Sequence, residues 1–373
     1  MLQQTTPQST PQFEPADERR YTVQVVDQID ADWDAVATKF ADLCLEQTAA
    51  FMTTRWGSSR LSGIILRDFV TAEPEAAALA VIAALPVVKL GLAYIKFGPL
   101  WRHNDQPPRP NILSAALGAL KFEFARRRGL LLRVMPPADP EFSSDWEQRT
   151  TLADFALRNV AQSSKRYLVN LTLSKQEQLA SLGAKWRANL RKANANGLII
   201  REVDPVAELP AFLRLYGAMS ARKQFLDRHH VEHLPAFVQA APRSLNVRMF
   251  LADAEGSPVA GTIIAGPGER VFTPFSASNQ EALPLRAGFA LRWAIIDALR
   301  GSRAKWLDLG GDEGDSGLRH FKEGNVGSQG RVVSIPGEFD YAESALSSAA
   351  TTAIAWAHGL PRIRSSRGLR PAE

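Results

Sequence analysis

Apolar runs with strand-like alternation are interleaved with helix-like segments along almost the whole chain. In the first half, a strand-like run is followed by a segment of helical periodicity that Asp30 is placed to N-cap. A second helical segment ends at Gly129, behind three arginines that suit a helix C-terminus. The elements expected in this half are strands at residues 21–26, 61–70, 76–98 and 130–136 and helices at 30–47 and 112–129. This alternation predicts a mixed α/β protein.

The second half repeats the pattern. Its expected elements are strands at residues 166–173, 198–203, 247–256, 257–268, 269–279 and 304–311 and helices at 175–197, 209–225, 234–241 and 285–302. Both halves close on a long helix followed by an apolar strand, in "ALKFEFARRRGLLLRVMPP" and "AIIDALRGSRAKWLDLGG". This correspondence suggests a structural duplication. The expected organisation is a disordered leader (1–19), an N-terminal domain (20–165), a C-terminal domain (166–345) and a helical, basic tail (346–373).

Composition fits a globular protein with sizeable cores, since 45% of the residues are hydrophobic and 22% are charged. The single cysteine, Cys44, excludes an intrachain disulfide framework, and its place in a helical pattern favours a buried structural thiol. The net charge of +5 favours polyanionic partners such as phosphates, tRNA or anionic membrane surfaces.

The leader lacks the apolar core of a signal peptide. The long apolar stretch at 76–98 is interrupted by Pro86, Lys89 and Lys96, which favours buried strands over a membrane span. We therefore expect a cytoplasmic protein without a transmembrane segment, with peripheral contact at the inner face of the membrane left open.

Several catalytic patterns are disfavoured. His229, Glu232 and His233 have the H-x-x-E-H spacing of inverted zincins, but Pro235 suits the first turn of a new helix. The histidines would then lie in the preceding connection, so a loop cluster without a metal is expected. No G-x-S-x-G, P-loop or strand-linked G-x-G-x-x-G pattern is present, which disfavours serine hydrolase chemistry, P-loop nucleotide hydrolysis and Rossmann-type binding.

A basic helical segment offers a candidate anion site. Arg187 and Arg191 are four residues apart and therefore neighbours on one helical face, with Asn189 and Lys192 beside them. Either this is a solvated charged face, or it binds a diphosphate or a tRNA backbone through bidentate arginine contacts. A weaker candidate is the loop-to-helix junction containing Arg286 and Gly288, where free N–H groups could bind an anion.

The stretch "WLDLGGDEGDSGLRHFKEG", residues 306–324, has the most unusual local composition. A strand-like run ends at Asp308, and two glycines that permit a sharp turn lead to Asp312 and Glu313. The spacing of the acids is not that of an EF-hand loop. We expect a strand end that opens into a cleft, followed by a short helix that brings Phe321 and Lys322 to it.

Four segments together resemble the Fem family of peptidoglycan interpeptide-bridge aminoacyltransferases, within the GNAT acyltransferase superfamily. They are "YIKFGPLW", "KRYLVNLTLSKQEQLASLGAKWRANLRKANANGLIIREVD", "RMFLADAEGSPVAGTIIAG" and "WLDLGG…GLRHFKEGNVG". The resemblance implies an α/β (α+β) fold of two tandem GNAT-like domains, each a mixed sheet flanked by helices, with the acceptor in a cleft formed mainly by the second.

The resemblance also implies transfer of an aminoacyl or acyl group to an amine on a cell-envelope glycan or peptidoglycan precursor, lipid- or nucleotide-linked. The donor would be aminoacyl-tRNA or acyl-CoA, with no tightly bound cofactor. The coiled-coil arm of some members is missing, and "LRAGFA" matches the acetyl-CoA loop only in part. Two alternatives stay open: an acyl-CoA-dependent N-acyltransferase of exopolysaccharide biosynthesis, and a catalytically inert GNAT-like binding protein. The oligomeric state is open as well.

The resemblance assigns roles to individual residues, while a backbone N–H of a splayed strand would stabilise the oxyanion. Lys322 would neutralise donor phosphate or developing charge, and Asp308, Asp312 or Glu313 would orient the amine or accept its proton. The donor would contact Arg286 and Gly288. The expected substrate-binding residues are Arg187, Asn189, Arg191, Lys192, Tyr216, Gly98, Pro99 and Phe321.

Overall fold

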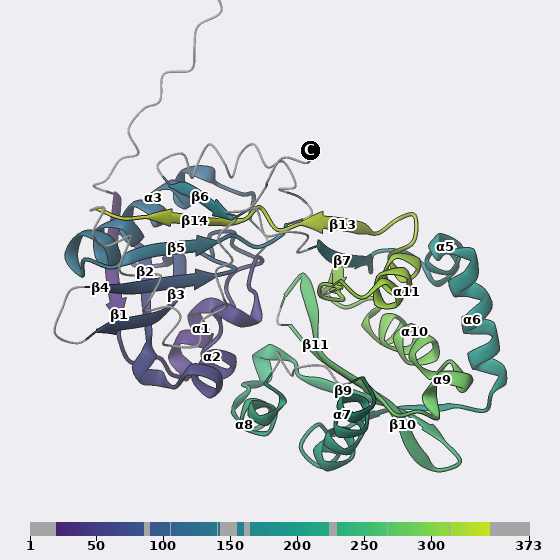
Figure 1. Ribbon diagram of the computed structural model, residues 1–373. Helices are drawn as coiled ribbons and strands as arrows, with labels where there is room; N and C mark the ends of the chain where they lie inside the picture. Colours follow the sequence, from purple (N-terminus) through teal and green to yellow (C-terminus); the bar gives the residue numbers. More distant parts are fainter. Residues whose placement is uncertain are drawn as a thin grey trace, which may run out of the picture.

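Two seven-stranded mixed sheets, each flanked by helices, organise the chain in the computed structural model (Figure 1). The structure describes residues 20–85, 90–104, 106–139, 141, 155–159, 165–223, 230–266, 268–312 and 314–343. The predicted leader (1–19) and tail (346–373) lie outside these residues. The expected fold class, a mixed α/β architecture in two tandem domains, is confirmed.

The first sheet has the strand order β1-β2-β3-β4-β5-β14-β6. Neighbours pair antiparallel except β4 and β5, which run parallel and are joined by a helical crossover. The strands are β1 (Tyr21–Val26), β2 (Leu61–Asp68), β3 (Pro74–Leu85), β4 (Leu90–Lys96), β5 (Leu131–Met135), β6 (Ala156–Asn159) and β14 (Glu338–Tyr341). The helical segments are α1 (Ala31–Ala37), η2 (Leu45–Gln47), α2 (Ala49–Trp56), η3 (Ser58–Arg60), α3 (Pro110–Leu120) and the π-helical η4 (Lys121–Arg127).

The second sheet has the order β13-β7-β12-β11-β10-β9-β8, again with one parallel pair, β11 and β12. The strands are β7 (Lys165–Asn170), β8 (Ile199–Val203), β9 (Arg248–Ala254), β10 (Ser257–Ala265), β11 (Arg270–Ser278), β12 (Trp306–Asp308) and β13 (Arg331–Ser334). The α-helices are α5 (Lys175–Ser181), α6 (Ala184–Ala195), α7 (Leu209–Lys223), α8 (Leu234–Ala240), α9 (Ala282–Leu285), α10 (Ala287–Leu299) and α11 (Ser316–Val326). The 3₁₀ turns are η5 (Val231–His233) and η6 (Arg243–Leu245).

The two sheets share one plan, but only the first takes a strand, β14, from the other half of the chain. Five strands follow in sequence order in each sheet, and β6 or β13 forms the far edge. Strand β14 lies between β5 and β6 in the first sheet, and β7 lies between β12 and β13 in the second. Since β7 follows β6 and β14 follows β13, the chain crosses twice, and Figure 1 shows β14 and β13 running in line across both domains. The expected second-domain range 166–345 therefore contains one strand of the first sheet.

Strand β14 is fixed to the first sheet by a buried ion pair. Arg133 of β5 donates to both carboxylate oxygens of Asp340, at 2.7 and 2.9 Å. The Tyr94 hydroxyl of β4 donates to Glu338 at 3.0 Å. Arg133 is only 4% exposed, so its charge depends on these acids for compensation.

The two domains also share a hydrophobic core. Cys44 and Phe97 of the first domain belong to the same cluster of buried residues as Phe212 of the second. Helix α2 packs on α8, where the Phe51 and Phe237 rings meet edge to face at 5.4 Å. Burial raises the pKa of the Cys44 thiol to about 12, in agreement with the structural role expected for it.

Two predicted helices are shorter than their apolar periodicity suggested. The helix expected at 30–47 ends at Ala37, and the buried carboxylate of Asp34 accepts the N–H groups of Ala49 and Ala50 at the start of α2. The helix expected at 175–197 is divided at Gly183, whose N–H donates to the Gly324 carbonyl. A tertiary contact prevails over helix periodicity in both places.

We expect Asp340→Ala to lower the free energy of unfolding by about 3 kcal/mol, because the substitution leaves the buried Arg133 without its bidentate partner. Urea denaturation followed by circular dichroism measures the effect. The control is Glu202→Ala, which breaks the bidentate contact of Glu202 with Arg248 between neighbouring strands at a surface where Glu202 is 47% exposed. Glu202→Ala should lower the free energy of unfolding by less than about 1 kcal/mol. Equal losses in the two variants would contradict the role assigned to β14.

Candidate functional site

The glycine turn after β12 forms the centre of the candidate site. Strand β12 ends at Asp308, and the Gly310 N–H donates to the Asp308 carboxylate at 2.8 Å while Gly310 adopts φ +75°. Helix α11 begins at Ser316, N-capped by Asp315, which accepts from the Leu318 N–H. The strand end, sharp turn and short helix expected here are all present.

Lys322 reaches back from α11 over this turn. Its Nζ donates to the Gly311 carbonyl at 2.5 Å, and the residue is only 9% exposed. A Cβ atom on Gly310 would lie 3.7 Å from Nζ, an ordinary contact distance, so the ammonium lies directly over the glycine turn. A positive charge is thus held at the carboxyl end of the parallel strand pair, where ligands of open α/β sheets bind.

Asp312 is buried and fully engaged. Its carboxylate accepts from the Tyr167 hydroxyl at 2.6 Å, the Gly314 N–H at 3.0 Å and Arg319 Nε at 2.9 Å. These donors, the Tyr167 hydroxyl first, hold the pKa of Asp312 far below its usual range. Burial, with the bond to Asp312, raises the pKa of Tyr167 to about 12 and keeps it protonated. A carboxylate so strongly ionised is a poor proton acceptor at neutral pH and better suited to holding the turn in place.

Asp308 lies on the opposite face of the sheet. Arg166 and Tyr167 are consecutive on β7 and therefore point to opposite sides, and Arg166 pairs with Asp308 at 2.9 Å. Asp308 is completely buried, and the Arg166 guanidinium lies 5.5 Å from the Phe97 ring of the first domain. Asp308 thus belongs to the domain boundary, while Lys322 and Asp312 share the turn. The fourth expected catalytic residue, Glu313, lies outside the described residues.

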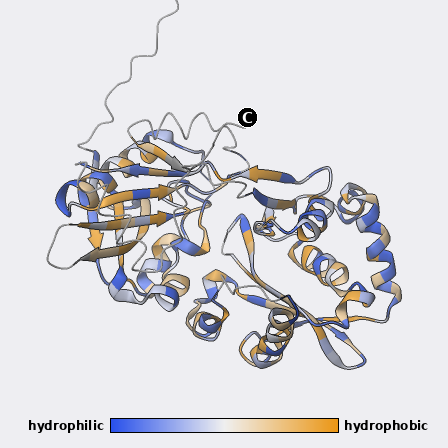
Figure 2. Ribbon diagram, in the orientation of Figure 1, coloured by the Kyte–Doolittle hydropathy of each residue, from blue (hydrophilic) through white to orange (hydrophobic). Residues whose placement is uncertain are grey.

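The basic helix α6 is only partly free for a ligand. Arg187 donates to the carbonyls of Ala180 (3.0 Å) and Leu182 and so satisfies the end of α5. Asn189 is half-buried, whereas Arg191 and Lys192 are exposed on a helix that is largely hydrophilic in Figure 2. Of the four residues expected to bind an anion on α6, Arg191 and Lys192 face solvent.

The remaining expected substrate residues lie in separate places. Tyr216 is 5% exposed and packs in the core near Phe212. Phe321 belongs to an aromatic cluster with Trp186 and Phe289, at centroid distances of 6.0 and 5.0 Å. Arg286 adopts a left-handed conformation (φ +58°) as N-cap of α10, and Gly288 is exposed in the first turn of that helix.

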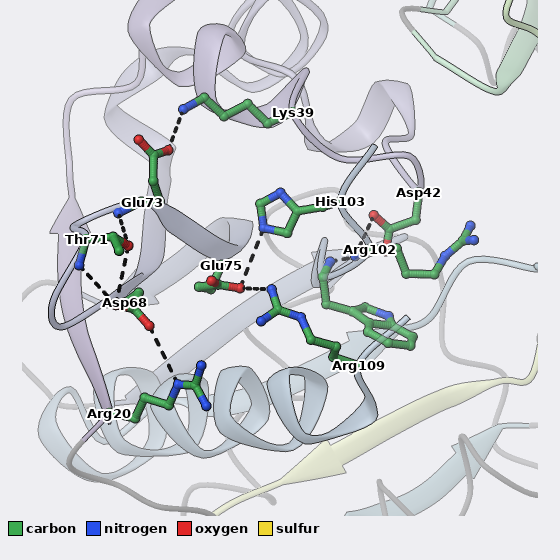
Figure 3. A network of polar contacts seen from close by, with 11 residues as sticks. Arg20, Lys39, Asp42, Asp68, Thr71, Glu73, Glu75, Arg102, His103 and Arg109 are labelled. Carbon is green, nitrogen blue, oxygen red and sulfur yellow. Dashed lines mark hydrogen bonds and ion pairs between the residues drawn. The ribbon is translucent and has the colours of Figure 1, made fainter. Parts of the chain in front are cut away.

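Gly98 and Pro99 line a hollow in the first domain that the sequence did not reveal as a unit. Its volume is about 430 Å³, including open solvent at the mouth, and Asp42, Arg102 and Asp139 supply its charges. Arg102 pairs with Asp139 at 2.5 Å, while the Asp42 carboxylate accepts the backbone N–H groups of Trp101 and Arg102 (Figure 3). Burial raises the pKa of Asp42 to about 6. The one sign of this hollow in the sequence was Asp42, an acid inside the apolar pattern around Cys44.

The same segment continues the polar network beyond the hollow. His103 and Arg109 both approach the Glu75 carboxylate, and Lys39 pairs with Glu73 (Figure 3). Arg109 immediately precedes α3, which forms the wall of the hollow with Leu113. The contacts of His103 and Arg109 with Glu75 tie the connection between β4 and α3 to β3.

The histidine cluster lies where the sequence placed it, before a new helix. Helix α8 begins at Leu234 with Pro235 in its first turn. The ligating atoms of His230, Glu232 and His233 lie within 4.8 Å of one another, and the Nδ1 atom of His230 is 3.0 Å from the Glu232 carboxylate. All three side chains are at least 39% exposed, and a direct imidazole–carboxylate contact accounts for their proximity. His229 lies outside the described residues.

Comparisons with known proteins agree on superfamily and fold. A family model described as an acetyltransferase (GNAT) domain matches residues 181–323. The crystal structure of FemX is similar with a TM-score of 0.70 at 15% identity, covering 86% of this chain and 97% of that one. L-PGS from Bacillus licheniformis is similar with a TM-score of 0.53 at 13% identity, covering 90% and 98%. No curated protein matches the sequence.

A third similar structure is the C-terminal domain of a putative lysylphosphatidylglycerol synthetase from Agrobacterium fabrum, with a TM-score of 0.53 at 12% identity, covering 85% of this chain and 94% of that one. The resemblance to GNAT-superfamily acyltransferases is confirmed, with a GNAT domain in the second half and a FemX-like tandem arrangement overall. Within the described ranges, no helix combines the length and apolarity that crossing a membrane requires.

We expect Asp312→Asn to reduce the free energy of unfolding at about pH 7, since the ionised carboxylate accepts three hydrogen bonds. The folded-state pKa is lower than the ordinary value of 3.8, so the carboxylate stabilises the fold above that value and loses its effect as the pH falls through the acid range. The difference between wild type and variant should therefore shrink toward low pH in denaturation at a series of pH values. Asp32→Asn, at an exposed position, controls for removal of one negative charge. A pH-independent difference would rule out this linkage.

Proposed function

We propose that this GNAT-type protein is an N-acyltransferase that passes an aminoacyl or acyl group to an amine on a cell-envelope glycan or peptidoglycan precursor. The observation that carries the proposal is the ammonium of Lys322, held at 2.5 Å from the Gly311 carbonyl where the parallel strand pair ends. The Fem-like order of the sequence motifs and the FemX-like arrangement of both domains support it. Such a reaction belongs on the cytoplasmic side of the membrane, where a peripheral contact would suffice.

In the proposed reaction, the neutral amine nitrogen of the acceptor attacks the carbonyl carbon of the donor ester or thioester. The new C–N bond gives a tetrahedral intermediate with a negatively charged oxygen, which backbone N–H groups stabilise. The C–O or C–S bond then breaks, and the leaving oxygen or sulfur takes the proton that the nitrogen releases. Lys322 offsets the negative charge of donor phosphate or of the leaving group.

The remaining charges suit binding and positioning better than proton transfer. Asp312 holds the turn that presents Gly311 to Lys322, through its bonds to Tyr167 and Arg319. The hollow at Gly98 and Pro99 is a candidate for acceptor contacts. On α6, the exposed Arg191 and Lys192 are available to a tRNA backbone.

A second candidate is an acyl-CoA-dependent N-acyltransferase acting on an amino sugar of an exopolysaccharide. The first turn of α10 favours it. Its N-cap, Arg286, makes no side-chain capping bond, and a side chain at Gly288 would meet no atom within 4 Å. Free N–H groups beside open space can receive a diphosphate.

We expect Lys322→Ala to reduce transfer more than roughly tenfold while leaving the fold intact, because it removes one electrostatic contact with the reacting groups. The assay supplies purified full-length protein with labelled acetyl-CoA or with tRNA charged with labelled amino acids. The acceptors are a nucleotide-linked muropeptide and an amino-sugar oligosaccharide. The matched control is Lys175→Ala, which removes a lysine 63% exposed at the surface. Near-normal transfer by folded Lys322→Ala protein would remove this lysine from the mechanism, and no transfer by wild type from either donor would leave an inert binding protein.

Gly288→Glu tests the second candidate. A carboxylate in the first turn of α10 suits the helix dipole, so folding should be unaffected, but it would repel a diphosphate. We expect the KM for acetyl-CoA to rise about tenfold or more if CoA binds there. Gly288→Ala, which adds only a methyl group in open space, is the control and should leave the KM unchanged. An unchanged KM in Gly288→Glu protein would place the diphosphate elsewhere.

A further inference from the structure

Buried polar side chains without partners gather in the helical layer of the second domain. Helices α5 and α6 lie outside α10 and α11 in Figure 1, and α6 packs on both. Among the described residues, side-chain nitrogen or oxygen atoms that are sealed from solvent and lack a hydrogen-bond partner occur in this layer in Gln178, Trp186, Arg292 and Asn325. Each of the four residues is at most 8% exposed. Such groups are costly unless something binds them.

Helix α6 packs on α10 and α11 through the Trp186 ring, which contacts residues close in sequence to Arg292 and Asn325. The Trp186 ring meets Phe289 of α10 at 5.1 Å and Phe321 of α11 at 6.0 Å. Arg292 is three residues beyond Phe289, and Asn325 is four beyond Phe321, so each lies one turn from a ring that touches Trp186.

The corner between α5 and α6 closes the region from the other side. The Gly183 N–H donates to the Gly324 carbonyl at 3.0 Å, and the Ser328 N–H donates to the Ser181 carbonyl at 2.8 Å. The Ser181 hydroxyl in turn donates to the backbone carbonyl of Gln178. Gln178 lies one turn before Ser181, and Asn325 directly follows Gly324. Both residues keep their amide oxygen and nitrogen unpaired.

Arg292 is the decisive member because it carries a charge. Other buried arginines face acids: Arg133 pairs with Asp340, Arg166 with Asp308 and Arg102 with Asp139. Arg292 has no such partner among the described residues, and both Nε and Nη1 are unsatisfied. Burial lowers the pKa of its guanidinium only to about 10, which leaves it cationic at neutral pH. An uncompensated buried charge costs several kcal/mol, so this arrangement calls for an anion.

We propose that Arg292, with Trp186, Asn325 and Gln178, binds a phosphate group inside this helical layer. The unpaired donors are the guanidinium, the indole N–H and two amide NH₂ groups, against two amide oxygens, and this excess of donors suits a phosphate's acceptor oxygens. Asn325 lies three residues from Lys322 on α11, so the site is one helical turn from the proposed reacting centre. The origin of this phosphate rests on the proposed function. It would belong to the donor, since acyl-CoA and the 3′ end of tRNA both carry phosphate.

The test is binding of pyrophosphate, CoA and uncharged tRNA to the full-length protein, followed by thermal unfolding and calorimetry. Wild type should be stabilised by pyrophosphate and by one of the two donor products. In Arg292→Met protein the affinity should fall tenfold or more, and the stability without ligand should be equal or higher, because a buried unpaired charge has gone. The control Arg60→Met, an exposed position in the first domain, should bind like wild type.

Each outcome decides the proposal. Stabilisation by CoA identifies an acyl-CoA phosphate, stabilisation by tRNA identifies a tRNA phosphate, and stabilisation by pyrophosphate alone identifies a free phosphate. No stabilisation of wild type, or equal stabilisation of Arg292→Met, would overturn the site. If Arg292→Met does not fold, Arg292→Lys and Asn325→Leu replace it, and unchanged pyrophosphate affinity in both would overturn the site equally. Binding is measured without catalysis, so an inactive wild type that binds phosphate would reject the proposed function and retain this site.

Discussion

The first strand of the second domain, β7, lies between β12 and β13, and the arrangement of the candidate site follows from this position. Strand β7 lies directly beside β12, where Arg166 and Tyr167 occupy consecutive positions and opposite faces. One of them pairs with Asp308 at the domain boundary, and the other with Asp312 at the glycine turn. A single strand, β7, therefore supplies the partners of the acids on both faces of the sheet beside β12.

Charges paired with acids and charges proposed to bind anions lie in different parts of the described chain. Arg133 with Asp340 and Arg166 with Asp308 are buried pairs that hold strands and domains together. Lys322 contacts a carbonyl, and Arg292 has two unsatisfied nitrogens. Both cations lie in the GNAT-matched segment, on helices that follow the two strands of the parallel pair. The two cations proposed to bind anions therefore belong to the same segment.

Much of the fold could be predicted from periodicity, because strands such as Arg248–Ala254 carry continuous apolar runs and Gly197 and Gly129 end helices in the expected way. The return of β14 to the first sheet could not be predicted, since β14 has four residues and its partner β5 is about 200 positions away. Lys322 and Asp312 at the turn followed from the order of strand, glycines and helix. The separation of Asp308 from Asp312 and the role of Arg187 at the end of α5 depend on register and tertiary contacts, which local spacing does not encode.

The position of β14 also affects the order in which the protein can be completed during synthesis. The Arg133–Asp340 pair joins residues 207 positions apart, so β5 and β6 emerge from the ribosome long before the strand that must lie between them. Until then β5 is an open edge and β6 has no partner strand, and such unpaired strands are prone to pairing with other chains. The first sheet can therefore be completed only after all strands of the second sheet have been translated.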